Sequence, residues 1–256
     1  MVHWVKFQRG GVEGFGALHG ESIDVHGGEL FGAPVATGDT LALGEVTLLT
    51  PCRPGKLIAL WNNSRAQAEK QGLTQPKEPL FFLKAPTSYL PHGGVIRRPA
   101  GYDGRVIYEA ELGIVISRAC KDADEATAAA AIFGYTCVND VTALGILDED
   151  SSFPQWARAK SFDTFGAFGP AIVTGLDVSG VSIRALLNGR ERQNYPVSDL
   201  FFQPAALVSR LSHAMTLLPG DLIACGTGPG ALPMRDGATI EIVIDGIDAL
   251  VNTYAE

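Results

Sequence analysis

The protein has 256 residues, of which 46% are apolar and 19% charged, and its 28 acidic and 20 basic side chains give a net charge of −8. A chain this apolar lies far from the composition of disordered proteins and is long enough to bury a sizeable core. The acidic balance argues against a nucleic-acid partner, since no basic run exceeds the pair Arg97 and Arg98. We expect a small-molecule partner or another protein.

The chain also lacks the patterns of membrane insertion and secretion. Its longest uncharged stretch in the Ala-rich region runs from Ala126 to Val138, shorter than the roughly 20 apolar residues of a membrane-spanning helix. Lys6 and Arg9 interrupt the apolar residues at the N-terminus, so we expect no signal peptide and a cytoplasmic protein. The four cysteines form no CxxC pair, and we expect them to be reduced and structural: Cys52, Cys120, Cys137 and Cys225.

Glycine and proline divide the chain into short pieces rich in Val, Ile, Phe and Thr, which is typical of a strand-dominated α+β protein. Short apolar runs separated by glycine turns predict a small N-terminal β domain over residues 1–50. The segment LLTPCRPGK then predicts a connection to a second domain over residues 51–256.

Local signals predict several elements of that second domain. Residues 57–61 (LIALW) indicate a buried strand, and Asn63 is the expected N-cap of a short helix that runs through Gln71 and stops at Gly72. The pairs at 188–189 (Asn-Gly) and 245–246 (Asp-Gly), each between strand-like runs, predict type I′ hairpins.

Residues 204–218 predict an amphipathic helix, because apolar side chains recur every three or four positions and Pro219-Gly220 ends the run. The simplest interpretation places its apolar face in the core: Leu207, Leu211, Met215 and Leu218.

The most informative segment is YEAELGIVI, in which Glu109 and Glu111 stand two apart and project from the same face of a strand. One interpretation is an exposed polar edge. However, the apolar run that follows Glu111 is typical of a strand buried on both faces, where two carboxylates need compensation by a cation.

Asp140 ends another apolar segment, IFGYTCVND, and is the third candidate ligand. Three carboxylates without histidine or cysteine at ligand spacing favour Mg²⁺ or Mn²⁺ over Zn²⁺, and an enolate or 2-oxo acid would complete the coordination. Downstream, WARAKSFDTFGAFGP places Lys160 and Asp163 among aromatic residues and glycines. This pair is either a desolvated ammonium near an anion or an ordinary surface ion pair.

Several ordered motifs between residues 47 and 254 together resemble the fumarylacetoacetate hydrolase superfamily. They are YEAELGIVI, GYTCVNDVT, WARAKSFDTFGAFGP, NGRERQN, MTLLPGDLIACGTGPG and DGIDALVN. The resemblance implies a mixed β-sandwich or β-roll core, usually a homodimer, and members that use Mg²⁺ or Mn²⁺ to cleave, decarboxylate or tautomerise 2-oxo acids.

Carried over by position, the resemblance implies that Glu109, Glu111 and Asp140 bind the metal, with Lys160 beside it and Thr227 facing the substrate carboxylate. Further substrate contacts are expected from the backbone around Gly226, and Gln193 is either a substrate ligand or a structural turn residue. Lys84 is a weaker candidate for the distal end of a diacid.

One segment departs from the pattern of the hydrolytic and many decarboxylating members, which carry a histidine and, three residues later, a glutamate in the helix after the first core strand. Aligned on Asn63, these positions hold Gln67 and Lys70, with Glu69 adjacent. Glutamine is no general base. We expect residues 62–75 to form a lid without a water-activating pair. His92 does not replace this pair, since it precedes two glycines in a predicted turn.

These expectations favour a metal-dependent isomerase or decarboxylase of 2-oxo or 2-hydroxydienoate acids from the catabolism of aromatic ring-cleavage products. A carbon–carbon hydrolase of the acylpyruvate or fumarylacetoacetate type is the first alternative. A non-catalytic relative that binds a metal or ligand is the second, because both lid positions have changed.

Overall fold

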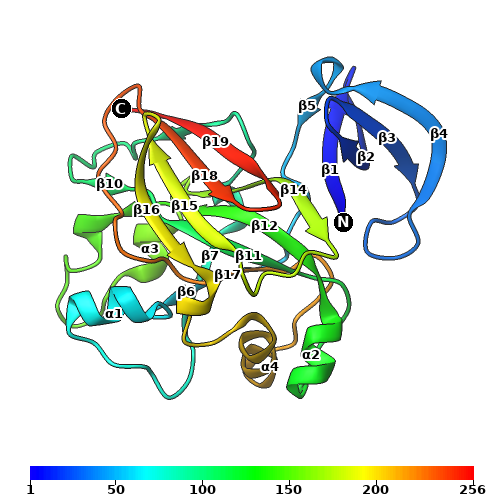
Figure 1. The fold of residues 1–256 in the computed structure, drawn as a ribbon. Coiled ribbons are helices and arrows are strands. Elements are labelled where there is room, and N and C mark those ends of the chain that lie inside the picture. Colours follow the sequence, from blue (N-terminus) through cyan, green and yellow to red (C-terminus); the bar gives the residue numbers. More distant parts are fainter.

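A computed structural model describes residues 1–256. Its first five strands form a small curved unit at one side of the molecule, drawn in blue in Figure 1. They are β1 (Val2–Arg9), β2 (Val12–His19), β3 (Ser22–Gly27), β4 (Val35–Ala42) and β5 (Thr47–Leu48). β1 pairs with β2 and β5, and also with β14 (Gly166–Thr174), so this unit continues the large sheet. A domain division at residue 50 stays a prediction.

The large sheet has the order β4-β3-β2-β1-β14-β12-β11-β17-β6-β7, with β8 beside β14. Its further strands are β6 (Leu57–Trp61), β7 (Leu80–Lys84), β8 (Tyr89–Leu90), β11 (Ala110–Ile116), β12 (Ile132–Asp140) and β17 (Leu222–Ala224). β11 and β12 are antiparallel at its centre, and every residue of β11 is buried. A separate short pair consists of β10 (Val106–Ile107) and β13 (Thr142–Ala143).

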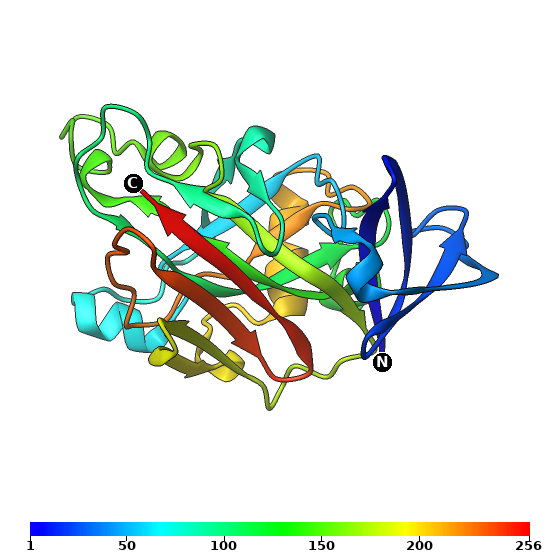
Figure 2. The ribbon, with the colours of Figure 1, turned by 90° about the horizontal axis from the view of Figure 1, so that it is seen from above.

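A second sheet, in the order β16-β15-β18-β19-β9, lies across one face of the large one (Figure 2). Its strands are β9 (Val95–Arg97), β15 (Ser182–Leu187), β16 (Arg190–Pro196), β18 (Thr239–Ile244) and β19 (Ile247–Ala255). Leu112 and Cys137 of the large sheet share one hydrophobic core with Ile242 and Leu250 of the second. The predicted α+β fold dominated by strands is confirmed.

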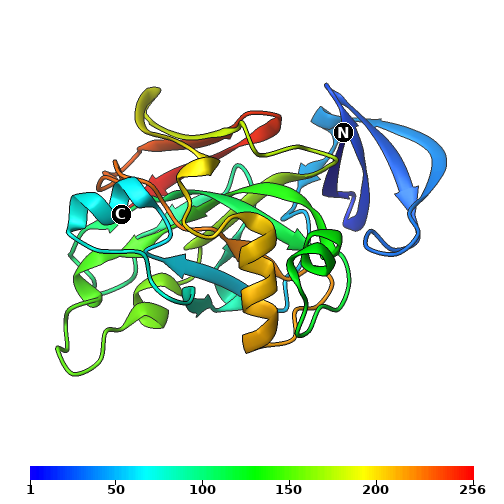
Figure 3. The same cartoon turned by 60° about the horizontal axis from the view of Figure 1, so that its bottom comes forward.

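Helices are few and short: α1 (Arg65–Gln71), α2 (Glu125–Ala131), α3 (Trp156–Lys160) and α4 (Pro204–Ala214). Four 3₁₀ turns cover Leu43–Glu45, Pro86–Ser88, Leu144–Ile146 and Val197–Asp199. α2 and α4 lie side by side on the face of the large sheet opposite the second sheet (Figure 3). None of the helices combines the length and the apolar character needed to cross a membrane.

Several local predictions are confirmed and one turn differs. The strand at 57–61 forms, and the hairpin at Asn188-Gly189 has φ of 52° and 70° at its two central residues, as type I′ requires. Asp245-Gly246 also connects two paired strands, but only Gly246 has a positive φ, so type I′ is wrong there.

The long predicted helix ends early. Met215 is extended, with φ −155° and ψ 156°, because the chain turns there so that Leu217 can exchange two backbone hydrogen bonds with Cys120. The alternation buries Leu217 and leaves Leu218 48% exposed. Leu207 and Leu211 are in the core as predicted, whereas the placement of Leu218 there is wrong.

The N-cap of α1 is Ser64 and not Asn63. Ser64 Oγ accepts a hydrogen bond from the backbone N–H of Gln67 at 3.1 Å, and Gly72 ends the helix with φ of 68°, as predicted. Asn63 is buried one residue earlier. Its side chain donates to the carbonyl of Cys225 and accepts from the N–H of Phe202, so it joins two distant segments to the start of the helix.

Candidate functional site

Three carboxylates meet where β11 and β12 come together. Glu109 precedes β11, Glu111 is its second residue, and Asp140 is the last residue of β12. The pairing of Ala110 with Asn139 brings these chain positions side by side, and one oxygen from each carboxylate lies within 4.8 Å of the others. The side chain of Glu109 is 15% exposed, while Glu111 and Asp140 are buried.

Two lysines reach this cluster from different elements. Lys160, the last residue of α3, has its Nζ 2.5 Å from Glu109 Oε2 and 2.6 Å from Asp140 Oδ2. Lys84, at the end of β7, contacts the other Asp140 oxygen and donates to the carbonyl of Val141 at 3.2 Å. Both lysines are almost completely buried. Of the two alternatives for Lys160, the surface ion pair with Asp163 is wrong, because Asp163 is exposed and the buried Lys160 ammonium pairs with Glu109 and Asp140.

The ionisation of the carboxylates follows from these contacts. Burial opposes the charged form of Asp140, but the ammonium groups of Lys160 and Lys84 outweigh it and hold its pKa below the usual range. Burial raises the pKa of Glu109, with Lys160 opposing. Burial and then the charges of Asp140 and Glu109 raise the pKa of Glu111 well above its usual value.

Glu111 is the one carboxylate of the three that no lysine contacts. Its Oε2 accepts a hydrogen bond from the backbone N–H of Gly226 at 2.7 Å, and its Oε1 is buried with no hydrogen-bond partner. A buried carboxylate oxygen without a partner is costly. The three-carboxylate set and this unpartnered oxygen fit a hard divalent cation such as Mg²⁺ or Mn²⁺, which prefers oxygen ligands.

The cluster opens into a cavity of about 540 Å³. Among the residues predicted as site residues, five line it: Glu109, Lys160, Thr227, Gln67 and Lys70. The first three come from the cluster end, and the last two come from α1. The helix of the predicted lid is thus at the cavity, although Glu69 is exposed and does not line it, and Asn63 is buried and hydrogen-bonded within the fold.

Two further predicted residues, Gln193 and Gly226, form hydrogen bonds with residues of the site. Gln193 is buried, donates from Nε2 to Thr227 Oγ1 and to the carbonyl of Gly228, both at 2.8 Å, and accepts from the N–H of Ala110 at 3.0 Å. Of the two alternatives for Gln193, these contacts favour the structural one. The N–H of Gly226 is already bonded to Glu111, so it orients that carboxylate.

Lys84 is not at a distal end of the cavity, contrary to the weaker prediction for it. Its ammonium lies among Asp140 and the carbonyl of Val141, with no exposed side-chain surface. The local sequence FFLKAP contains no signal for this long-range contact, because Asp140 is 56 residues away in the chain.

Sequence reasoning missed the walls of the cavity. Trp61 and Trp156 line it with ring centroids 4.7 Å apart, and Trp156 also stacks on Phe82 with an interplanar angle of 22°. Asp148 lines it from the segment before α3. Trp156 opens the motif that carries Lys160, and this proximity in sequence is the signal that could have identified it.

No histidine lines this cavity. His92 has its Nδ1 3.1 Å from the carbonyl of Ala249 and 3.2 Å from the N–H of Val251, so it joins the predicted turn to β19.

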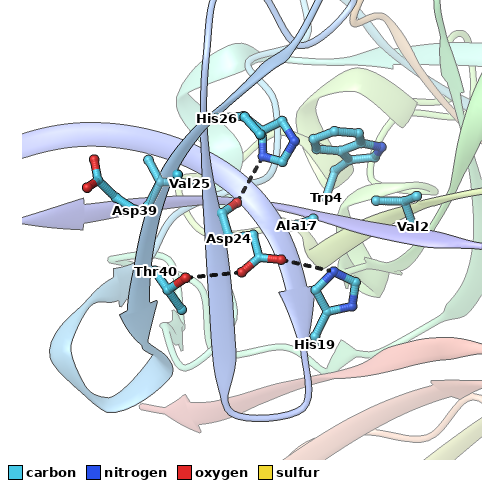
Figure 4. A pocket seen from close by; sticks show the side chains of 11 residues that line it. Val2, Trp4, Ala17, His19, Asp24, Val25, His26, Asp39 and Thr40 are labelled. Atoms are coloured by element: carbon cyan, nitrogen blue, oxygen red, sulfur yellow. Dashed lines mark hydrogen bonds and ion pairs between the residues drawn. The ribbon is translucent and has the colours of Figure 1, made fainter.

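A second hollow, of about 530 Å³, lies on the β1–β4 sheet (Figure 4). Its polar side chains interact with one another: Thr40 donates to Asp24 at 3.3 Å, and His19 Nε2 lies 3.6 Å from the same carboxylate. No lysine or arginine lines it, and its acidic and imidazole groups do not converge as a set of three metal ligands. We therefore place the candidate site in the first cavity.

Comparison with known proteins agrees with the fold. Residues 56–255 match the family model described as fumarylacetoacetate (FAA) hydrolase, C-terminal, and residues 2–51 match a model described as Rv2993c-like, N-terminal. The chain belongs to the fumarylacetoacetate hydrolase family. It is 41% identical to Protein Rv2993c of Mycobacterium tuberculosis, over 87% of this chain and 83% of that one.

A bifunctional 4-hydroxyphenylacetate degradation isomerase/decarboxylase of Salmonella dublin is 35% identical over 86% of this chain, which spans only 51% of that longer protein. Among solved structures, a 5-carboxymethyl-2-hydroxymuconate delta-isomerase from Mycobacterium smegmatis is 38% identical, with a TM-score of 0.91 and 99% of both chains covered.

Two further structures are similar. A 2-hydroxyhepta-2,4-diene-1,7-dioate isomerase from Mycobacterium marinum is 35% identical, with a TM-score of 0.90 over 100% of this chain and 98% of that one. A maleylpyruvate hydrolase from Sphingobium sp. SYK-6, in complex with manganese(II) and pyruvate, is 25% identical, with a TM-score of 0.80 over 99% and 98%.

Proposed function

We propose that this protein is a divalent-metal-dependent isomerase or decarboxylase of 2-oxo or 2-hydroxydienoate acids from aromatic catabolism. The observation that carries the proposal is the buried cluster of Glu109, Glu111 and Asp140 beside Lys160, at one end of a cavity without a histidine. Relatives with isomerase and decarboxylase activities support the same reaction class.

Glu109, Glu111 and Asp140 are the residues that would hold Mg²⁺ or Mn²⁺, and the manganese-containing neighbour supports this choice of metal. Such a cation supplies a Lewis acid for the oxygen of a 2-oxo group. Lys160 keeps a positive charge at the cavity wall, because the charges of Asp140, Glu109 and Glu111 raise its pKa despite burial. That charge favours the anionic enolate over the neutral ketone.

Thr227 is the neutral polar group at this end of the cavity. Its hydroxyl is held by Gln193 and by the carbonyl of Ala110, so its position is fixed before a substrate enters. Isomerisation and decarboxylation need no activated water, and Gln67 does not supply a base for one. A homodimer of this chain is a further part of the proposal and follows from the family resemblance alone.

The test is turnover of 2-hydroxyhepta-2,4-dienedioate, followed by loss of its ultraviolet absorbance with Mg²⁺ or Mn²⁺ and again with EDTA. We expect turnover only with metal. Glu111→Gln should abolish this turnover, whereas the exposed control Glu21→Gln should keep it. Mass spectrometry distinguishes isomerisation, which keeps the mass, from loss of CO₂. Equal rates in EDTA, or no turnover of any 2-oxo acid, would contradict the proposal.

A carbon–carbon hydrolase is the alternative, and Asp148 is the observation that favours it. Apart from Glu109, Asp148 is the only carboxylate that lines the cavity, and it therefore is the available base for a water molecule. This alternative predicts release of pyruvate from an acylpyruvate, and loss of that release in Asp148→Asn. Absence of pyruvate across a series of acyl chains would exclude it.

A further inference from the structure

The cavity contains one cationic side chain that the reaction chemistry does not use. Lys70, in the last turn of α1, lines the cavity, and no ion pair in the structure includes it. Lys160, the only other cation of the lining, is engaged by Glu109 and Asp140. A lysine that faces a small-molecule cavity without an acidic partner is available to an anionic group of the ligand.

The same face of α1 adds amide groups beside this ammonium. Gln67 and Gln71 stand three residues before and one after Lys70, and both line the cavity. Residues three and four apart lie on one face of a helix, so Gln67 flanks Lys70 and Gln71 directly. An ammonium with neighbouring amide donors is a receptor for a carboxylate.

Apolar and aromatic side chains also line the cavity. The larger ones are Leu60, Trp61, Ile107, Leu144, Leu147 and Trp156. Stacking on Phe82 holds the ring of Trp156, and the ring of Trp61 lies 4.7 Å from it at an interplanar angle of 44°. A flat, conjugated carbon chain packs well against such a wall, whereas a charged or hydroxylated chain would lose hydration there without compensation.

One acidic group opposes this arrangement. Asp148 lines the same cavity, is exposed, and is not in ion-pair contact with Lys70. Its negative charge repels a second carboxylate of the ligand, so Lys70 is the group that makes the binding of a dianion favourable.

We propose that Lys70 binds the far carboxylate of the substrate, an inference that rests on the proposed function. The substrates would then be dicarboxylic 2-oxo or 2-hydroxydienoate acids, whose first carboxylate and oxo group lie at the Glu109 and Lys160 end. A flat apolar chain against Trp61 and Trp156 would connect that end to α1. Lys70 is a specificity-determining residue in this proposal and takes no part in the bond changes.

The experiment compares two substrates that differ only in the far carboxylate: 2-hydroxyhepta-2,4-dienedioate and 2-hydroxyhexa-2,4-dienoate. Lys70→Met is expected to lower kcat/KM for the diacid by about 10- to 100-fold, as for loss of a charged hydrogen bond, mainly through KM. The monoacid should change less than about twofold, within the usual effect of an exposed substitution. Lys77→Met, an exposed lysine outside the cavity, is the matched control and should change neither.

The outcomes separate this proposal from the function on which it rests. If Lys70→Met impairs both substrates equally, Lys70 serves a contact within the protein and the proposal is overturned. If the wild type turns over the monoacid as well as the diacid, it is also overturned. If neither compound is turned over, the proposed function fails. The role of Lys70 is then tested by calorimetry, which measures the affinity of the Mn²⁺-loaded protein for non-reacting 2-oxo acids. Preference for 2-oxohexanedioate over 2-oxopentanoate that disappears in Lys70→Met would support the receptor role, and equal affinities would refute it.

Discussion

Lys84 and Lys160 contact different oxygens of one buried carboxylate, that of Asp140. The two ammonium groups come from β7 and α3, which are far apart in the chain, and both are nearly inaccessible to solvent. They fix the orientation of the Asp140 carboxylate and keep it ionised. A carboxylate held in this way needs no rearrangement when a ligand arrives, which is the usual role of a supporting residue around a metal site.

The first prediction concerns the stability that Lys84 provides. Lys84→Met should lower the free energy of unfolding by about 3–5 kcal/mol, because it leaves a buried carboxylate with one partner fewer. Denaturant titration in EDTA measures the change, and Lys77→Met should stay within about 0.5 kcal/mol of the wild type. A loss below about 1 kcal/mol would show that Lys160 alone compensates Asp140.

The second prediction concerns Glu111, whose charge raises the energy of the metal-free protein. Its pKa is raised by burial, so replacing it with glutamine removes an unfavourable charge while the contact with the N–H of Gly226 can persist. Glu111→Gln should therefore unfold in EDTA at the wild-type temperature or above it. Calorimetric scans of the two proteins compare these temperatures.

The same variant should lose the response to metal. A cation at about 100 times its Kd stabilises the folded state by about 2.7 kcal/mol, which corresponds to a rise of about 5–10 °C in Tm for a chain of this size. We expect this rise with Mn²⁺ in the wild type and in Glu21→Gln, and little of it in Glu111→Gln. An unchanged response in Glu111→Gln would remove Glu111 from the set of ligands.

Local sequence was sufficient for features that depend on neighbours in the chain. The alternation around Glu109 and Glu111 placed both carboxylates at a strand, and the end of an apolar run placed Asp140. Their convergence was predictable because adjacent antiparallel strands bring such ends together. The hairpin at Asn188-Gly189 followed from turn chemistry in the same way.

Features fixed by distant partners were not predictable. Asn63 had the chemistry of an N-cap, but its amide bonds Cys225, 162 residues away, and the cap passed to Ser64. From the sequence, Lys84 was a candidate substrate ligand, whereas in the structure its ammonium contacts Asp140. In the sequence, Lys70 drew attention only because it stands where other members carry a glutamate. In the structure it lines the cavity, so its charge is a feature of the site.

A third prediction compares the two residues at the start of α1. Ser64→Ala removes the cap of Gln67 and should cost about 1 kcal/mol of stability. Asn63→Ala should cost more, about 2–3 kcal/mol, because it leaves the buried carbonyl of Cys225 and the N–H of Phe202 without their partner. Denaturant midpoints at equal m-values measure both. The reverse order would show that the two hydrogen bonds of Asn63 contribute less to stability than the cap.

The fourth prediction uses the tryptophans to locate the ligand. Trp61 and Trp156 line the cavity, whereas Trp4 lies in the N-terminal sheet beside the second hollow. Addition of Mg²⁺ and oxalate, a small chelating dianion, should change the fluorescence of the wild type and of Trp4→Phe, because the field at the cavity aromatics changes. Trp156→Phe should lose most of this change while binding oxalate within about tenfold, since the ring provides packing and no coordination. A signal that survives in Trp156→Phe but is lost in Trp4→Phe would place the ligand in the hollow on the β1–β4 sheet and not beside Lys160.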